Sequence, residues 1–136
     1  MQSCPCGLRD AAQHLRPYAQ CCGPYLDDFA GLPASDAEAL MRSRYSAFVM
    51  QREAYLLATW HASRRPTRVS FDPGVKWLGL EVRDHHQLDD CHAEVEFVAR
   101  QRDPSGRAVR LHERSRFVRQ ADGDVMRWYY LDGDWR

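Results

Sequence analysis

The sequence lacks several features that would assign the chain to a familiar class. Its 19 basic and 19 acidic side chains leave no net charge, which argues against a protein dominated by electrostatic binding to nucleic acid. No apolar run approaches membrane-spanning length, and there is no internal repeat or low-complexity segment. Lysine is nearly absent, with Lys76 as its single instance. At 136 residues the chain fits one domain with a real core and a short N-terminal appendage.

The N-terminus also lacks the apolar stretch of a secretory signal. We therefore expect a cytoplasmic protein in a reducing compartment, where stable disulfides are not favoured.

Cysteine is scarce beyond residue 22. Four of the five cysteines lie within the first 22 residues, as Cys4-Pro-Cys6-Gly and Cys21-Cys22-Gly. Two close thiol pairs, each followed by glycine, can surround one tetrahedral metal ion, and four thiolates favour zinc. His14 is a reserve ligand. The alternatives are disulfides or cysteines without a role. The sequence predicts that Cys4, Cys6, Cys21 and Cys22 bind one structural zinc ion.

The chain divides near residue 30. Residues 1–30 hold the four paired cysteines and a linker, and the turn-rich segment Gly23–Pro33 is expected to pack loosely on the rest. Residues 31–136 form the main domain. Ser35 and Glu38 have the spacing of a capping box, so a helix is predicted from Asp36 to about Arg52 and a second from Glu53 to about His61. Alternating apolar residues then predict strands at Val75–Arg83, Cys91–Arg102, Arg107–Gln120 and Val125–Asp132.

Two turns predict the strand register. Pro104-Ser105-Gly106 suits a three-residue loop that sets Phe97 opposite Glu113. Asp122-Gly123, taken as a two-residue turn, sets Phe117 opposite Trp128 and Glu113 opposite Asp132. The result is an α+β fold in which helices pack on one face of a curved antiparallel β-meander and leave a concave pocket.

Eight segments carry a family resemblance, namely Cys4–Gly7, Cys21–Gly23, Ala39–Phe48, Thr59–His61, Trp77–Leu80, Val95–Arg100, His112–Phe117 and Trp128–Gly133. In these segments the chain resembles the YchJ family of small bacterial proteins. The resemblance implies an NTF2-like cone and an N-terminal SEC-C-type zinc motif with Cys4, Cys6, Cys21 and Cys22 as ligands. The motif is similar to the zinc-binding tail of the SecA translocation ATPase, where such a tail engages protein partners, although the usual spacer is shorter and rich in lysine.

Charged residues on predicted core faces indicate a candidate pocket. Glu113 and Ser115 fall on the buried strand face, and the predicted register brings Asp132 near them. Arg44, on the apolar stripe of the first helix, is the expected cationic partner of Glu113. Tyr45, Trp60 and Tyr130 would form the walls, and His61 is either a general base or a helix cap. The alternative is a buried structural ion pair that joins helix and sheet.

Two further clusters suggest weaker hypotheses. The group His85, His86, Asp89, Asp90 and His92 is expected in an exposed loop without fixed ligand geometry, which argues against a second metal site. A basic row at Arg110, His112, Arg114 and Arg116 is opposed by Glu94 and Glu96 in the predicted register, which argues against a nucleic-acid surface.

Three functions remain open at this stage. The first is a non-catalytic adaptor that docks on a protein partner through the zinc motif, and it is favoured because a closed four-thiolate shell is structural. The second is a small-molecule or enzymatic pocket in the cone. The third is association with RNA or the ribosome. No segment predicts membrane insertion, and the sequence indicates no oligomeric state.

Overall fold

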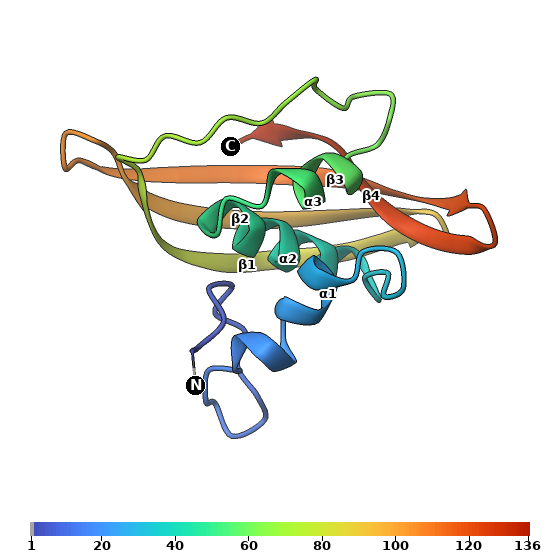
Figure 1. Ribbon diagram of the computed structural model, residues 1–136, viewed down its shortest axis with the longest axis horizontal. Coiled ribbons are helices and arrows are strands. Elements are labelled where there is room, and N and C mark those ends of the chain that lie inside the picture. Colours follow the sequence, from blue (N-terminus) through green and yellow to red (C-terminus); the bar gives the residue numbers. More distant parts are fainter. Residues whose placement is uncertain (1) are drawn as a thin grey trace.

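The computed structural model describes residues 2–136 and consists of three helices in front of one antiparallel sheet, with a small N-terminal lobe beside them (Figure 1). A 3₁₀ turn at Tyr18–Gln20 leads into α1 (Gly23–Asp27), α2 (Ala37–Val49) and α3 (Glu53–Ala58). The strands follow as β1 (Lys76–Asp89), β2 (His92–Arg102), β3 (Ala108–Asp122) and β4 (Val125–Trp135). This confirms the predicted α+β class and its meander.

Helix α2 begins one residue later than the predicted capping box. Asp36, not Ser35, is the N-cap, because its carboxylate accepts a hydrogen bond of 2.7 Å from the backbone N–H of Ala39. The helix ends at Val49, and Gln51 follows in a left-handed conformation with φ 57°. Within residues 2–136, no helix combines the length and apolar character needed to cross a membrane.

The sheet has the order β1-β2-β3-β4, and the predicted register between β2 and β3 is confirmed. Phe97 lies opposite Glu113, and Val95 lies opposite Ser115. Gly106 takes the left-handed position of the connecting loop, with φ 89°, as the turn requires.

The predicted register between β3 and β4 is wrong. The turn residues are Gly123 and Asp124, and Gly123 alone has a positive φ of 61°, which suits the first position of a type II′ turn. This change sets Phe117 opposite Tyr130 instead of Trp128. An irregularity between Arg116 and Phe117 then shifts the pairing once more, so that Glu113 faces Trp135.

Strand β1 is longer than predicted and continues to Asp89. His85 and His86 therefore lie in a strand, not in a loop. Cys91 lies in the turn between β1 and β2 and is partly exposed.

The hydrophobic core is continuous across residue 30, and the linker does not pack loosely. Leu26 of α1 is buried in the same cluster as Leu40 and Tyr45 of α2. The Arg127 guanidinium donates hydrogen bonds to the backbone oxygens of Phe29 at 2.6 Å and Ala30 at 2.7 Å, and it stacks on the Phe29 ring. The turn-rich composition could not reveal these contacts, because Arg127 lies in the last strand, far from the linker in the sequence. The predicted domain boundary near residue 30 stays a prediction.

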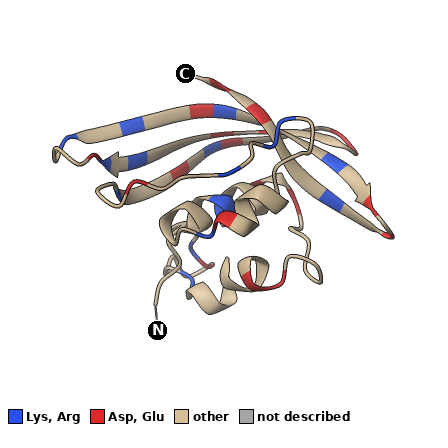
Figure 2. Cartoon of the chain, turned by 45° about the horizontal axis from the view of Figure 1, so that its top comes forward, with Lys and Arg blue, Asp and Glu red and all other residues tan. Residues whose placement is uncertain are grey.

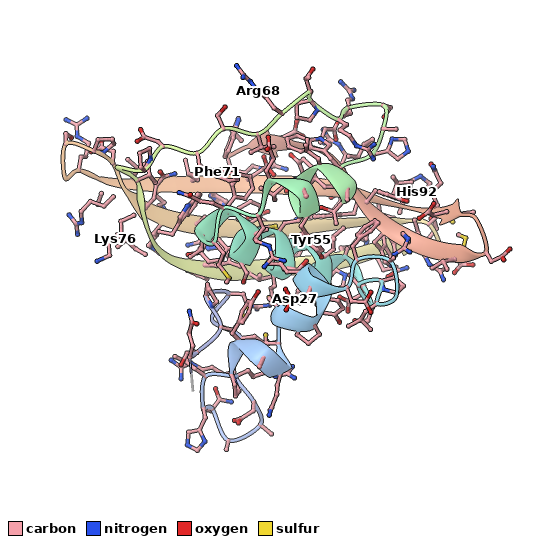
Figure 3. All side chains as sticks on the ribbon, viewed as in Figure 1. Asp27, Tyr55, Arg68, Phe71, Lys76 and His92 are labelled. Carbon is pink, nitrogen blue, oxygen red and sulfur yellow. The ribbon has the colours of Figure 1, made fainter. Side chains whose placement is uncertain are left out.

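The segment between α3 and β1 runs along the edge of the helical layer and joins helices to sheet (Figure 1). Phe71, labelled in Figure 3, contacts Phe48 of α2 with ring centroids 6.3 Å apart. At the start of this segment, Trp60 forms a parallel bridge with Tyr130 of β4. That bridge places the Trp60 side chain over the inner face of the sheet.

The strands carry charges of both signs (Figure 2). Arg114 of β3 forms ion pairs with Glu94 at 2.5 Å, Asp84 at 2.9 Å and Glu96 at 3.1 Å. The strands therefore neutralise much of the basic row that β3 carries.

Candidate functional site

The four N-terminal cysteines converge in the lobe. The sulfur atoms of Cys4, Cys6, Cys21 and Cys22 all lie within 4.8 Å of one another, and three of these residues are buried while Cys21 is partly exposed. These residues could hold one metal ion in a shell of four thiolates.

The local backbone explains how the two thiol pairs meet. Isolated bridges between Ser3 and Pro17 and between Arg9 and Leu15 make the segment between the two thiol pairs a hairpin. Asp10 closes the hairpin tip by accepting hydrogen bonds from two backbone N–H groups, and His14 lies there exposed, outside the sulfur cluster. Gly23 follows the second thiol pair, and a Cβ atom there would lie 2.8 Å from the Tyr18 carbonyl oxygen.

The cysteine cluster is bonded directly to α2. The Arg42 side chain donates a hydrogen bond of 3.0 Å to the backbone oxygen of Cys6. The Cys4 sulfur lies 3.6 Å from the Ser46 hydroxyl oxygen, and both groups are buried. A change at the cluster should therefore also affect the position of α2.

The chemistry of the cluster fits a bound cation. Hydrogen bonds from the Cys22 and Cys6 thiols lower the pKa of Cys4, whereas burial and the negative charge of Cys6 raise the pKa of Cys21 to about 12. Four thiols this close cannot all ionise together unless a positive ion offsets their charge. Sulfur ligands favour soft or borderline ions.

A groove of about 440 Å³ lies between the lobe and the N-terminal part of α2. Leu8, Cys21 and Tyr25 line it from the lobe and α1, and Ala39 and Arg42 line it from α2. The groove depends on the lobe for one wall, so it requires the cysteine cluster to be intact.

A second cavity, of about 280 Å³, lies between α2 and the inner face of the sheet. Its walls are mostly aromatic and aliphatic, and Trp135, which is 69 % exposed, stands at the mouth. Six residues of the candidate pocket line this cavity, namely Arg44, Tyr45, Trp60, Glu113, Ser115 and Tyr130.

Glu113 is the acidic group of the cavity, and only 8 % of the residue is exposed. Its Oε2 atom accepts hydrogen bonds from the Ser115 hydroxyl and, at 3.4 Å, from the Tyr130 hydroxyl. Burial raises the pKa of the Glu113 carboxyl, although both hydroxyls and the positive charge of Arg44 oppose that rise. Its other oxygen, Oε1, has no hydrogen-bond partner within residues 2–136.

The expected ion pair between Arg44 and Glu113 is not formed. The Arg44 Nη1 atom donates hydrogen bonds to the Leu56 backbone oxygen at 2.9 Å and to the Thr59 hydroxyl at 2.6 Å. Its guanidinium carbon lies 5.0 Å from the centre of the Trp60 ring and 4.7 Å from that of Tyr130. The carbonyl dipoles at the end of α3 and two aromatic faces satisfy this cation, which is why it needs no direct carboxylate contact.

Two predicted pocket residues lie elsewhere. Asp132 is opposite Arg116, outside the cavity, and accepts a hydrogen bond of 2.6 Å from it, because the register shift reversed its face. His61 is also outside the cavity. Its ring nitrogens lie 2.7 Å from the Ser63 hydroxyl and 2.8 Å from the Gln120 side-chain oxygen, so it ties the segment after α3 to β3.

Sequence reasoning missed three residues around the carboxylate. Trp77 and Trp135 line the cavity, and their bulk in strand-like segments is the signal that could have found them. Gly133 packs on Glu113, because a Cβ atom there would lie 2.6 Å from the Glu113 Cδ atom. A glycine inside a strand marks such a close approach.

The comparisons with known proteins cover nearly the whole chain. Residues 36–133 match the family model "YchJ, middle NTF2-like domain". A UPF0225 protein from Polaromonas sp. (strain JS666) is 68 % identical over 133 residues, covering 98 % of this chain and 93 % of the relative. One from Bordetella parapertussis is 51 % identical over 135 residues, covering 98 % of this chain and 93 % of the relative.

Two solved structures share the fold. A crystal structure of a SEC-C motif containing protein from Psychrobacter arcticus has a TM-score of 0.80 and 34 % identity, covering 97 % of this chain and 81 % of the other. A solution structure of a SEC-C motif containing protein from Rhodopseudomonas palustris has a TM-score of 0.77 and 33 % identity, covering 98 % of both chains. With the family match and the high identities, they show that this chain belongs to the YchJ family of UPF0225 proteins, with an NTF2-like domain and a SEC-C-type cysteine lobe.

Proposed function

We propose that the NTF2-like cone is a non-catalytic binding site for a small organic molecule. One observation carries this proposal: Glu113, which is 8 % exposed and whose Oε1 atom has no hydrogen-bond partner among residues 2–136, lines an apolar cavity of about 280 Å³. A concave, mostly apolar site with few polar groups is the usual form of a small-molecule pocket.

The alternative of a purely structural ion pair loses support from the position of Arg44. Its hydrogen bonds go to Leu56 and Thr59, so the cation does not close off Glu113. A buried carboxylate that is not fully paired costs stability, and such groups occur preferentially where a ligand is bound.

The cavity proposal is tested by filling the cavity. Ala99 of β2 lines it and is 3 % exposed, so Ala99→Met would occupy part of the space, whereas Ala121→Met would add the same group at an exposed position of β3. Ligand-observed NMR with a library of small aromatic fragments should yield ligands that bind wild type and Ala121→Met but not folded Ala99→Met. Equal binding to all three proteins, or no bound fragment, would contradict the proposal.

For the lobe, we propose that the four cysteines bind one zinc ion in a purely structural role. Four thiolates complete a tetrahedral shell and leave no open position for catalysis. Metal analysis of protein purified without chelator should find about one zinc per chain in wild type and none in the Cys4→Ser/Cys21→Ser double variant. Full occupancy in that variant would exclude this ligand set.

A second candidate function is an adaptor that docks on a protein partner through the zinc lobe. The groove beside Cys21 and Cys22 favours it, because lobe and α2 together form a recess with the apolar residues Leu8, Tyr25 and Leu32 in its lining. The ion pairs of Arg114 and Arg116 give no comparable support to an RNA-binding role.

The adaptor hypothesis can be tested with a variant that blocks the groove but leaves the four cysteines unchanged. Ala39 lines the groove, so Ala39→Arg should abolish capture of a specific partner from a bacterial lysate. Ala54→Arg, at an exposed position of α3, is the matched control and should retain it. A protein captured equally by both variants would not be a groove partner.

A further inference from the structure

The polar groups of the cavity also restrict the class of ligand, and this inference rests on the proposed binding function of the cone. We propose that the cavity selects a small neutral molecule, with one ring or two, that carries a hydroxyl group. The hydroxyl donates a hydrogen bond to the Oε1 atom of Glu113.

The first argument is the direction of the hydrogen bond. Ser115 and Tyr130 both donate to Oε2 of Glu113, so their protons are already used. In the ionised form of the carboxyl, the remaining oxygen, Oε1, is an acceptor. A ligand that meets this atom in that form must bring a donor.

The second argument concerns cations, which a cavity of aromatic rings and a carboxylate would otherwise be expected to attract. Here the chain supplies its own cation. The Arg44 guanidinium lies against both Trp60 and Tyr130, at 5.0 and 4.7 Å from the ring centres. Burial lowers the pKa of Arg44 only to about 10, so the group stays protonated at neutral pH. A cationic ligand would thus enter a cavity that already contains a positive charge.

The third argument is charge balance. Among residues 2–136, Arg44 and Glu113 are the two lining residues with ionisable acidic or basic side chains, and the charges that they can carry are opposite in sign. For a charged ligand, repulsion by one of these groups offsets attraction by the other, so the cavity does not compensate the free energy that is lost when the ligand's charge leaves water. A neutral molecule disturbs neither charge.

The fourth argument is size and surface. A cavity of about 150 Å³ can hold benzene, and this one has about 280 Å³. The space therefore fits one ring with a short side chain or two fused rings. Phe97, Leu111 and Trp77 contribute apolar walls, so most of the ligand should be hydrocarbon.

Four probes of nearly equal size separate these arguments. Isothermal titration calorimetry on the full-length, metal-loaded chain at neutral pH would compare 4-ethylphenol with 4-ethylanisole, which lacks the donor, and with 4-ethylbenzoate and 4-ethylbenzylammonium, which carry charge. We expect 4-ethylphenol to bind roughly tenfold or more tightly than 4-ethylanisole, because a hydrogen bond to a charged acceptor contributes that much. Both charged probes should bind more weakly than 4-ethylphenol.

Variants then assign the preference to Glu113. Glu113→Leu should abolish the preference for 4-ethylphenol over 4-ethylanisole. Glu113→Gln keeps the size of the side chain and an uncharged acceptor, so it should reduce this preference. The glutamine variant replaces the leucine variant in the test if the latter does not fold. Glu81→Leu, at an exposed position of β1, should leave it unchanged.

The possible outcomes separate the ligand class from the binding function. Equal binding of 4-ethylphenol and 4-ethylanisole to wild type would overturn the hydroxyl inference while leaving a functional apolar cavity. Tightest binding of either charged probe would overturn the neutrality inference. If none of the four probes binds, the inference fails, and the fragment screen with Ala99→Met decides independently whether the cone binds ligands at all.

Discussion

The cysteine lobe and the cone cavity contain the two chemically distinctive sites of the chain, and they are encoded differently in the sequence. The lobe takes its four clustered sulfur atoms from Cys4–Cys22, and the short hairpin between the two cysteine pairs is stabilised by its own backbone bonds. The cavity takes its groups from α2, all four strands and the segment after α3. Spacing alone indicates the first site, whereas the second exists only once strand register is fixed.

The two regions are nevertheless joined by α2. One side of this helix holds the lobe through Arg42 and Ser46, and another side presents Arg44 and Tyr45 to the cavity. The lobe therefore contacts and supports α2, the helix that covers the cavity. Experiments that damage one region should show how far the other depends on it.

Metal removal should have the largest effect. Cys4, Cys6 and Cys22 belong to the same core as α2, so chelation should destabilise the whole domain by roughly 5 kcal/mol or more, since structural zinc contributes its binding energy to folding. Circular dichroism melts with and without chelator would measure this. Cys91→Ser, outside the cluster, should respond like wild type. Loss of NMR signals from residues 2–22 alone would show that the lobe is separable.

Truncation of Arg44 should have the next largest effect on the free energy of unfolding. Arg44→Met removes donors from the Leu56 oxygen and the Thr59 hydroxyl, which should cost roughly 3 kcal/mol in denaturant melts. In double-mutant cycles, Arg44→Met should couple more strongly to Thr59→Val than to Glu113→Gln. The reverse order would show that the arginine acts mainly as an ion-pair partner of Glu113.

Gly133→Ala should perturb the cavity and leave the lobe intact. The new methyl group would lie 2.6 Å from the Glu113 Cδ atom, so the carboxyl must move, at a cost of about 1–3 kcal/mol. Affinity for 4-ethylphenol should fall, while the zinc content stays at the wild-type value. Because the clash involves the Glu113 side chain, the double variant Gly133→Ala/Glu113→Ala should be more stable than the sum of single effects predicts. Strict additivity would argue against the close contact.

The smallest expected effect is a pH dependence. The pKa of the Glu113 carboxyl is raised by burial, so the folded state holds this proton more tightly than the unfolded chain. Stability should therefore fall as pH rises from the unfolded pKa through the folded pKa, and Glu113→Gln should lack this contribution. The charged or titratable groups that influence it are Arg44 on α2, Tyr130 on β4 and Arg116 on β3. Subtracting melts of the variant from those of wild type isolates the effect, and a difference that does not change with pH would contradict it.

Particular residues show which parts of the fold could be predicted. The loop Pro104-Ser105-Gly106 has one favoured geometry, and the register of Phe97 against Glu113 followed from it. At Asp122-Gly123 the glycine admits two turn positions, and the protein uses the other one. The irregularity after Arg116 has no local signal, and it moved Asp132 out of the cavity and onto Arg116.

The cavity shows the same limit for side-chain partners. Burial of Arg44 and Glu113 was predictable from the periodicity of helix and strand. The absence of an ion pair between them was not predictable, because Arg44 donates to the Leu56 backbone oxygen near the end of α3. The sequence predicted that this helix ends at about His61, whereas it ends at Ala58. The hydrogen-bond partners of Arg44 depend on the relative positions of α2, α3 and β3, and no single segment of the sequence determines these positions.

Chemical-shift mapping tests most directly the claim that the cone, and not the lobe, binds the ligand. Titration of 4-ethylphenol into uniformly labelled, metal-loaded wild-type protein should perturb the amide signals of Glu113 and Ser115 and the indole signals of Trp60 and Trp77. Signals from residues 2–22 should change little. If instead the largest changes fall among Cys4–Cys22 and the cavity signals stay fixed, the assignment of ligand binding to the cone is wrong.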